Sequence, residues 1–456
     1  MVLAAGRATR LGEVTGGRSK LLLRLGGLTL VERAVRMLLA CGLERVVVVV
    51  GYEGEAVAAA AARADPDRVH IVSAERWDEG NGQSLAAAEP ALSGERRFVL
   101  LCADIVFSNG SFPDLVSSNE PAALIDPSPG ADAWAAGTRV RVRDGRATAF
   151  STELPDPAID CGAFVFELDI FEFQRQAAAA DDHTLTGAFG RLAAARGMKA
   201  LPLPAGALWR DVDTPEDLRD ARRMLRRSLI KQSDAPIFRY LYRPVSTRVT
   251  MALAPLRVPP DAITYLACLL GLSAACTLAW GQGILGGLLI QANTILDGVD
   301  GETARLQFRS SPRGAVLDAV IDRIVDGSLV AGVGLWLWHP FDPSLEFKVG
   351  ILSASAYGWG FIAYLFQARL KGFEVSGAER PLVLLLGGRD SRLLILSIGS
   401  MIYQPGAAVA GGWALYLSSV FRRLFLKRRR PGTDPAVPAS PHHVGEAADR
   451  NLHEVR

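Results

Sequence analysis

The chain has 456 residues, and its 50 Lys and Arg against 48 Asp and Glu give a formal net charge of only +2, which shows no overall bias toward nucleic acid. The length allows two or three domains, and the mean hydropathy of +0.19 is high for a soluble protein. Five cysteines without CxxC or zinc spacing indicate buried thiols in a reducing compartment.

The first 225 residues alternate short apolar runs with helical stretches, and the opening MVLAAGRATRLG lacks the basic-then-apolar order of a signal peptide. The alternation predicts an α/β domain built on a mostly parallel, doubly wound sheet. The dipeptide Asp144-Gly145 predicts a hairpin turn. The expected strands are 46–52, 70–74 and 98–107, and the expected helices are about 29–41 and 54–64.

A glycine-containing loop, GRATRLGEVTGGRSK, follows the first apolar run. Gly6 allows close approach of the backbone to a ligand, and Arg10 and Lys20 can meet a triphosphate. Asp104 ends a buried strand and should reach the same edge of the sheet, where α/β proteins bind ligands. Two plainer interpretations remain open: Asp104 capping a turn, and Arg10 as a solvated surface residue.

The opening AAGRATRL and Lys20 are followed in order by EGNGQSL (79–85), CAD (102–104), IDCG (159–162) and WRDVDTPEDL (209–218). In this order the domain resembles the sugar-nucleotidyltransferases, and especially the cytidylyltransferases that activate inositol 1-phosphate. Two positions depart from that pattern: Ala8 stands where relatives often have glycine, and Ser19 stands where proline often precedes the lysine.

The resemblance implies a role for each matching residue. Asp104 and Asp213 would hold Mg²⁺, with Asp211 as the rival of Asp213, while Arg10 and Lys20 would neutralise the phosphates. The remaining residues would line the nucleotide and the alcohol: Gly82 and Ser84 near the base, and Asp160 and Gly162 near the alcohol. Asp213 could instead be only the N-cap of a helix starting at Pro215, and we expect His183 to be an ordinary helix-start residue.

Residues 226–260 interleave aromatic side chains with arginines, which is typical of a segment at a membrane surface; a soluble linker helix is the alternative. The next part, 261–426, is apolar enough for an all-α membrane domain, and the tail 427–456 should be disordered. Basic loops predict that both ends of this domain face the cytoplasm. We expect six spans, at about 261–280, 283–304, 314–338, 349–368, 390–405 and 406–423.

Four carboxylates stand within the apolar segments at helical spacing: Asp297, Asp300, Asp318 and Asp322. Two helices joined by the loop QFRSSPR would point them at one cleft. Because four like charges at close range need cations between them, this set predicts Mg²⁺ or Mn²⁺. The alternative is a charged loop whose acids pair with nearby arginines, namely Arg305, Arg309, Arg313 and Arg323.

The stretch matches D-x2-D-G-x2-A-R-x8-G-x3-D-x3-D at each fixed position and so resembles the CDP-alcohol phosphatidyltransferases. The resemblance implies two divalent ions held by the four aspartates, Asp322 as the general base, and a homodimer. The substrate would lie beside the remaining motif residues: Gly301, Ala304, Arg305 and Gly314. Cations at Arg369, Lys371, Arg380 and in GGRDSRLL (387–394) are candidates for binding an anionic acceptor.

A cytidylyltransferase fused to a CDP-alcohol transferase resembles the bifunctional enzymes that join inositol-1-phosphate cytidylyltransferase to di-myo-inositol-phosphate phosphate synthase. This resemblance implies that CTP and inositol 1-phosphate give CDP-inositol, which then reacts with a second inositol 1-phosphate and releases CMP. One alternative is a lipid acceptor in the second step, and another is a membrane-bound nucleotide sensor without catalysis.

Overall fold

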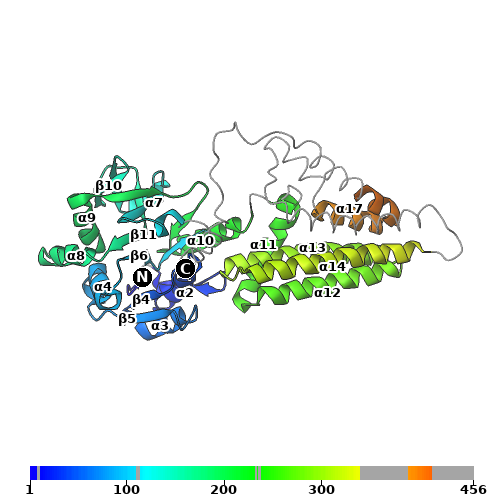
Figure 1. Ribbon diagram of the computed structural model, residues 1–456, viewed down its shortest axis with the longest axis horizontal. Helices are drawn as coiled ribbons and strands as arrows, with labels where there is room; N and C mark the ends of the chain where they lie inside the picture. Colours follow the sequence, from blue (N-terminus) through cyan, green and yellow to red (C-terminus); the bar gives the residue numbers. More distant parts are fainter. Residues whose placement is uncertain (8–10, 109–112, 232–233, 235–237, 339–388, 413–456) are drawn as a thin grey trace, which may run out of the picture.

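The computed structural model describes residues 1–456 except 8–10, 109–112, 232–233, 235–237, 339–388 and 413–456. A nine-stranded sheet forms the centre of the N-terminal part (Figure 1). In spatial order its strands are β5 (Val69–Ser73), β4 (Val46–Val50), β1 (Val2–Ala4), β6 (Arg97–Cys102), β11 (Ile159–Glu167), β8 (Ala122–Asp126), β12 (Met198–Pro202), β10 (Arg146–Ser151) and β9 (Arg139–Arg143).

The sheet is mixed rather than mostly parallel: its first four strands are parallel, but antiparallel pairs dominate the second half, where β8 and β12 still pair in parallel. β5, β4, β1 and β6 pair in parallel, whereas β11 is antiparallel to both β6 and β8. A strand buried on both faces has the same continuous apolar composition in either direction, so the sequence pattern does not reveal its orientation. The hairpin prediction is confirmed: Asp144 and Gly145, both with positive φ, join β9 to β10.

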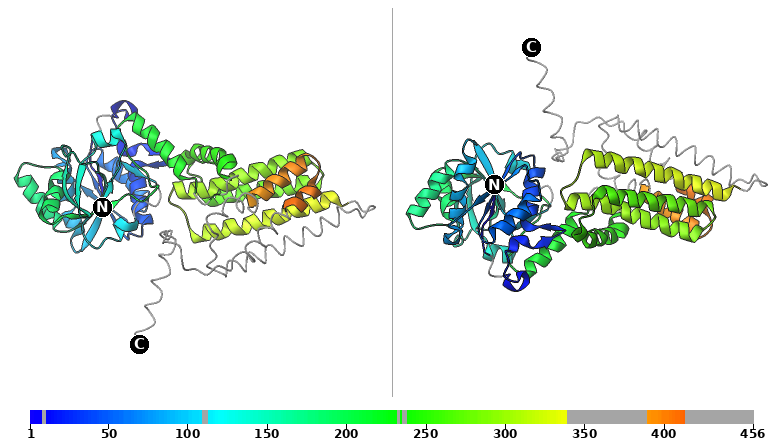
Figure 2. Two further views of the ribbon diagram at one scale, coloured as in Figure 1. Left: turned by 90° about the horizontal axis from the view of Figure 1, so that it is seen from above. Right: turned by 90° about the horizontal axis from the view of Figure 1, so that it is seen from below.

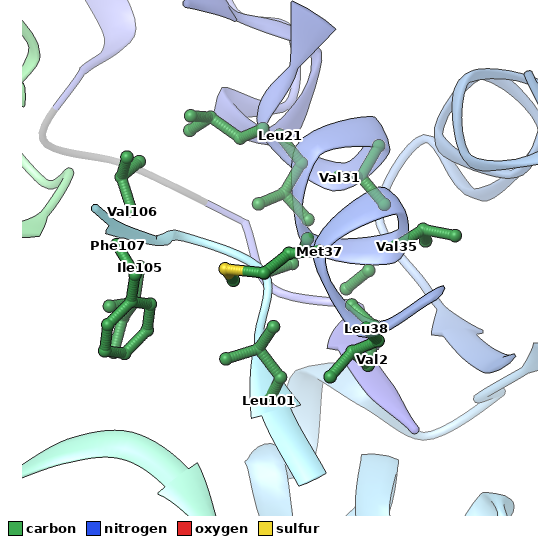
Figure 3. Packing of buried hydrophobic residues seen from close by; sticks show 14 of the residues in the cluster. Val2, Leu21, Val31, Val35, Met37, Leu38, Leu101, Ile105, Val106 and Phe107 are labelled. Carbon is green, nitrogen blue, oxygen red and sulfur yellow. The ribbon is translucent and has the colours of Figure 1, made fainter. Parts of the chain in front are cut away.

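Helices cover both faces of the sheet, which explains the unbroken valine run of β4. Val46, Val48 and Val50 belong to one core cluster, and the alternate residues Val47 and Val49 belong to the other. The first cluster, shown in part in Figure 3, packs α2 (Leu30–Ala40), α3 (Gly54–Ala62) and α10 (Pro215–Ser228) on the sheet. The second cluster packs α4 (Asn81–Ala87), α8 (Ile170–Ala179) and α9 (Leu185–Arg196).

Short elements connect these layers. They are α1 (Gly12–Thr15), η1 (Lys20–Leu22), β2 (Arg24–Leu25), β3 (Leu28–Thr29), η2 (Trp77–Glu79), α5 (Glu89–Leu92), β7 (Ile105–Phe107), α6 (Pro113–Val116), α7 (Ala131–Ala136) and β13 (Trp209–Asp211). Two of them carry predicted site residues, Lys20 in η1 and Asp211 in β13. Strand β13 pairs with β7, and β2 pairs with β3 in a small hairpin.

The C-terminal part is helical, and its long helices extend away from the sheet (Figure 1). A π-helical turn, η3 (Phe238–Tyr242), leads into α11 (Arg243–Leu253) and η4 (Ala254–Leu256). Then follow α12 (Pro260–Ala279), α13 (Gly283–Leu306), α14 (Pro312–Leu337) and α17 (Arg389–Met401). Helix α12 packs on both α13 and α14, while α17 lies against α13 (Figure 2).

The observed helices begin and end within a few residues of the first, second, third and fifth expected spans. Within the described part of the chain, one helix, Pro260–Ala279, is long and apolar enough to cross a membrane. The expected span 349–368, most of the span 406–423 and the expected disordered tail lie outside the described residues. Six membrane helices therefore stay a prediction.

The two parts of the molecule share a packed interface. Leu306, at the end of α13, and Ala254, at the start of η4, belong to the core cluster of the α/β part. The turn of the β2–β3 hairpin lies against them, and the Arg257 guanidinium pairs with the Glu32 carboxylate of α2. The helix that carries Asp297 and Asp300 thus ends against the α/β part.

Candidate active sites

Lys20 and three aspartates from distant parts of the chain meet at one edge of the sheet. The Lys20 ammonium lies 2.9 Å from an Asp104 oxygen and 2.5 Å from an Asp213 oxygen. Carboxylate oxygens of Asp104, Asp211 and Asp213 all lie within 4.8 Å of one another. The structure therefore brings both Asp211 and Asp213 to Asp104. The two residues that the sequence offered as alternative metal ligands lie together with Asp104 in one group of three carboxylates.

Local structure explains how these aspartates are positioned. Asp104 lies in the two-residue turn between β6 and β7. Its carbonyl accepts a hydrogen bond from Val212 N at 3.2 Å, which fixes the segment between Asp211 and Asp213 beside it. The N-cap of α10 is Thr214, which forms a capping box with Asp217. Asp213 is therefore not the helix cap, and the plainer interpretation of that residue is wrong.

The charges of this cluster depend on one another. Burial disfavours the charged form of Lys20, but Asp104, Asp211 and Asp213 outweigh this effect and raise its pKa above the usual value. Desolvation of the Asp211 carboxyl group and repulsion from Asp104 raise the pKa of Asp211 to about 8. Among the described residues, the three carboxylates carry more negative charge than the Lys20 ammonium neutralises, which favours the binding of a further cation.

Asp160 and Gly162 lie on β11 at a bulge next to the same edge. The Asp160 carboxylate accepts a hydrogen bond from Gly162 N at 2.9 Å, and burial raises the pKa of Asp160 to about 6. Gly162 has a φ of +65°, and a Cβ there would lie 2.2 Å from a methyl carbon of Ile105. Glycine is thus required where β11 passes the strand that follows Asp104.

The segment EGNGQSL lies against the start of α9. Gly82 N donates to the His183 carbonyl at 2.8 Å, and a Cβ on Gly82 would lie 2.7 Å from that oxygen. His183 is therefore more than the helix-start residue we expected, since its ring also contacts the Gln83 amide at 3.1 Å. Ser84 is buried in α4. Whether Gly82 and Ser84 contact a nucleotide base stays a prediction.

Two other predicted residues belong to the opening loop. Gly6 follows β1, and a Cβ added to it would meet no atom within 4 Å, so a ligand has room to approach its backbone. Arg10 lies outside the described residues, and its phosphate role stays a prediction.

The second site lies between α13 and α14, joined by the loop 307–311 as the spacing predicts. Carboxylate oxygens of Asp297, Asp318 and Asp322 lie within 4.8 Å of one another. Asp300 is buried beside them and accepts a hydrogen bond from the Thr264 hydroxyl at 2.6 Å. Three of the four predicted aspartates therefore form a cluster, while Asp300 is oriented by α12.

Arg389 on α17 contacts this cluster. Its guanidinium lies 3.1 Å from Asp297, 2.8 Å from Asp322 and 2.9 Å from Asp326. The sequence analysis left open a charged loop whose arginines pair with the four aspartates, namely Arg305, Arg309, Arg313 and Arg323. No ion pair between these arginines and the four aspartates occurs among the described residues. Sequence reasoning missed Asp326, although Gly314, Asp318, Asp322 and Asp326 continue one i, i+4 series.

The other motif residues lie at the helix ends near the α/β part. Arg305 donates to the Leu229 carbonyl at 3.1 Å, and a Cβ on Gly301 would lie 3.2 Å from the Arg305 guanidinium. Ala304 occupies the same turn of α13. Gly314 N donates to the N-cap hydroxyl of Ser311 at 3.0 Å.

Both clusters offer only carboxylate oxygens as ligands, the donor type that hard divalent cations prefer. Each has three such groups within reach of one ion. The residues therefore fit a divalent metal ion at each site.

The chain matches two family models, a MobA-like NTP transferase domain over residues 1–137 and a CDP-alcohol phosphatidyltransferase over residues 257–419. It is thus a bifunctional transferase that combines a nucleotidyltransferase with a CDP-alcohol phosphotransferase. A curated relative from Rubrobacter xylanophilus, named bifunctional IPC transferase and DIPP synthase, is 36% identical over 94% of this chain and 96% of the relative. The chain belongs to this family of bifunctional IPC transferases and DIPP synthases.

Two further similarities concern single parts of the molecule. A phosphatidylinositol phosphate synthase from Mycobacterium marinum is 31% identical over 44% of this chain and 89% of the relative. A solved inositol-1-phosphate CTP transferase from T. maritima is 23% identical, covers 49% of this chain and 93% of its own, and has a TM-score of 0.43.

Proposed function

We propose that the protein makes di-myo-inositol phosphate phosphate in two steps. The first site joins CTP and inositol 1-phosphate to give CDP-inositol and pyrophosphate. The second site transfers inositol phosphate from CDP-inositol to a second inositol 1-phosphate and releases CMP. The proposal rests chiefly on the similarity over nearly the full chain to relatives named for both activities, and two acidic clusters support it.

In the first step, a phosphate oxygen of inositol 1-phosphate attacks the α-phosphorus of CTP, and the bond to pyrophosphate breaks. Lys20 and Arg10 bind the negative phosphates, and Asp104 and Asp213, with Asp211 beside them, hold a divalent ion. Such an ion, Mg²⁺ or Mn²⁺, neutralises phosphate charge when bound. Asp160 and Gly162 border the alcohol, and Gly82 and Ser84 border the base.

In the second step, a hydroxyl of the acceptor attacks the phosphorus that carries the inositol, and the bond to CMP breaks. Asp297, Asp300 and Asp318 provide oxygens for divalent ions, and Asp322 takes the hydroxyl proton. Gly301, Ala304, Arg305 and Gly314 border the substrate. Arg389 contacts two of these aspartates, so its positive charge would attract substrate phosphates that bind there.

We further propose a membrane protein divided as 1–225, 226–260, 261–426 and 427–456, with six spans and both sites on the cytoplasmic side. Several large apolar side chains on the long helices are exposed, which suits contact with lipid: Leu266, Leu269, Ile284, Leu288, Val320 and Ile324. The basic flanks favour the cytoplasmic orientation. A homodimer through the membrane domain belongs to the same proposal.

A lipid acceptor is the second candidate for the transfer step. The similarity of the helical part to a protein named phosphatidylinositol phosphate synthase favours it. Both candidates share the first step and CDP-inositol as the intermediate, so only the final product separates them.

The test uses the full-length protein in detergent with Mg²⁺, CTP and inositol 1-phosphate, followed by ³¹P NMR of the aqueous products. We expect a phosphodiester signal together with CMP and pyrophosphate. If CDP-inositol accumulates alone, and a phosphodiester product forms only after lipid is added, the acceptor is instead a lipid. If CTP is not consumed, inositol 1-phosphate is the wrong alcohol.

A further inference from the structure

The turn after β4 holds the loop that carries Lys20. Tyr52 N donates to the Ala5 carbonyl at 3.0 Å, where the loop begins, and the Tyr52 hydroxyl donates to the Gly17 carbonyl at 2.7 Å. Ser19 N donates to a carboxylate oxygen of Glu53 at 2.5 Å. Two consecutive residues of the turn therefore fasten the loop near its start and near its end.

Glu53 has an unusual backbone for this contact. Its φ of 49° and ψ of 37° lie in the left-handed region, where a side chain other than glycine is strained. It occupies the N-cap position of α3, but its side chain caps no backbone N–H of that helix. The carboxylate turns instead to the loop, so the strained conformation serves the contact with Ser19.

Ser19 is the residue through which this contact reaches the site. It is 1% exposed, so its N–H would lack a partner without Glu53. Its hydroxyl accepts from Leu21 N as the N-cap of η1, and the next residue is Lys20. Fixing Ser19 therefore fixes the backbone from which the Lys20 ammonium reaches Asp104 and Asp213.

We propose that Glu53 is a positioning residue for nucleotidyl transfer, acting through the Ser19 N–H on Lys20. This inference rests on the proposed function of the first site. Ser19 has a φ of −57° and a ψ of 131°, which a proline ring also adopts. Proline at this position would fix the same backbone and would remove the N–H that needs Glu53.

The experiment is a double-mutant cycle in the full-length protein, read as the rate of pyrophosphate release from CTP and inositol 1-phosphate. We expect Glu53→Ala to lower kcat by roughly 10–100-fold, because a small displacement of Lys20 misaligns the phosphates. Glu53→Gln keeps an oxygen acceptor and should stay within a few-fold of wild type. Ser19→Pro should do the same, and Glu53→Ala combined with Ser19→Pro should recover most of the lost rate.

Controls separate this role from general damage. Glu55→Ala removes an exposed carboxylate from the first turn of the same helix and should leave the rate unchanged. Transfer from supplied CDP-inositol, at the other site, should be normal in each variant, which shows that the protein is folded.

Each outcome decides the matter. Recovery by proline supports the positioning role, because proline does not repair a helix start that has lost its side chain. Full activity of Glu53→Ala overturns the positioning role. The role is also overturned if Glu53→Ala loses activity, Ser19→Pro alone is active, and the double variant recovers none of the lost rate. If Ser19→Pro alone is inactive, Glu53→Gln decides: activity supports the role, and a rate as low as that of Glu53→Ala overturns it. A wild-type protein that does not consume CTP would refute the proposed function itself.

Discussion

In the described structure, each acidic cluster contacts a basic side chain that partly neutralises its charge. Lys20 contacts Asp104 and Asp213, while Arg389 contacts Asp297 and Asp322. Both cations lie in largely enclosed surroundings, where an unpaired carboxylate would be costly. The two clusters belong to different parts of the chain, so a change in one should leave the other intact.

We expect Asp322→Asn and Asp104→Asn to block different steps. Asp322→Asn removes the proposed base, so transfer should fall by about 10²–10⁴-fold while CDP-inositol accumulates.

Asp104→Asn should lower CDP-inositol formation by roughly 10²–10³-fold and leave transfer from supplied CDP-inositol unchanged. Chromatography of CTP, CDP-inositol and CMP measures both steps. Normal CMP release by Asp322→Asn would refute its role as the base, and loss of both steps in either folded variant would contradict independent sites.

At the scale of elements, a buried polar network joins α11 to α13. The Glu302 carboxylate is completely buried and accepts hydrogen bonds from Ser246 and Thr250 at 2.6 Å each. It also pairs with Arg243, whose guanidinium contacts Asp234 at 2.7 Å. Because Glu302 lies between two motif residues, Gly301 and Ala304, the network holds α11 against the turn of α13 that borders the proposed second site.

Glu302→Ala should destabilise the protein strongly. The change leaves two hydroxyls and part of the Arg243 charge without their buried acceptor, which costs about 3–5 kcal/mol. A thermal unfolding curve in detergent should show a clear fall in Tm. The exposed Glu216, which pairs with Arg219 on the surface of α10, is the matched control, and Glu216→Ala should change the Tm little. An equal Tm for Glu302→Ala and wild type would mean that the network does not stabilise the fold.

At the scale of the whole molecule, the β2–β3 hairpin fixes how the two parts meet. Gly27 has a φ of +83°, and a Cβ there would lie 2.1 Å from the Ala254 carbonyl oxygen. The Gly27 carbonyl accepts from Arg257 at 3.0 Å. Arg33 lies over the Phe308 ring, 5.6 Å from its centroid. Since the hairpin follows Lys20 and contacts the end of α13, it links the loop of the first site to a helix of the second.

Gly27→Ala should loosen this interface, because the new methyl group meets a backbone atom that cannot rotate away. Hydrogen exchange should become faster in the hairpin and at the end of α13. Gly42→Ala is the matched control: Gly42 has a nearly equal φ of +87°, yet a Cβ there would meet nothing within 4 Å. Both variants place alanine at a similar positive φ, but only the methyl group of Gly27→Ala meets the C-terminal part, so only this variant should affect exchange near Leu306. Equal exchange in the two variants would show that the contact does not hold the parts together.

Features that depend on local spacing could be predicted from the order of the residues. The helical period placed Asp297 and Asp300 on one helix and Asp318 and Asp322 on the next, and the structure forms both helices within two residues of the predicted bounds. The dipeptide Asp144-Gly145 marked its hairpin because a turn of that type needs positive φ. The apolar run at 46–52 predicted a strand, and the structure forms β4 there with all five residues buried.

Contacts between distant residues depend instead on how the whole chain packs. Lys20 and Asp213 are 193 positions apart, and Asp326 and Arg389 are 63 apart; no periodic pattern relates such pairs. The antiparallel direction of β11, the contact of Glu53 with Ser19 and the burial of Glu302 were hidden for the same reason. Local propensity and spacing act over a few residues, whereas these contacts arise when packing of the whole chain brings separate elements together.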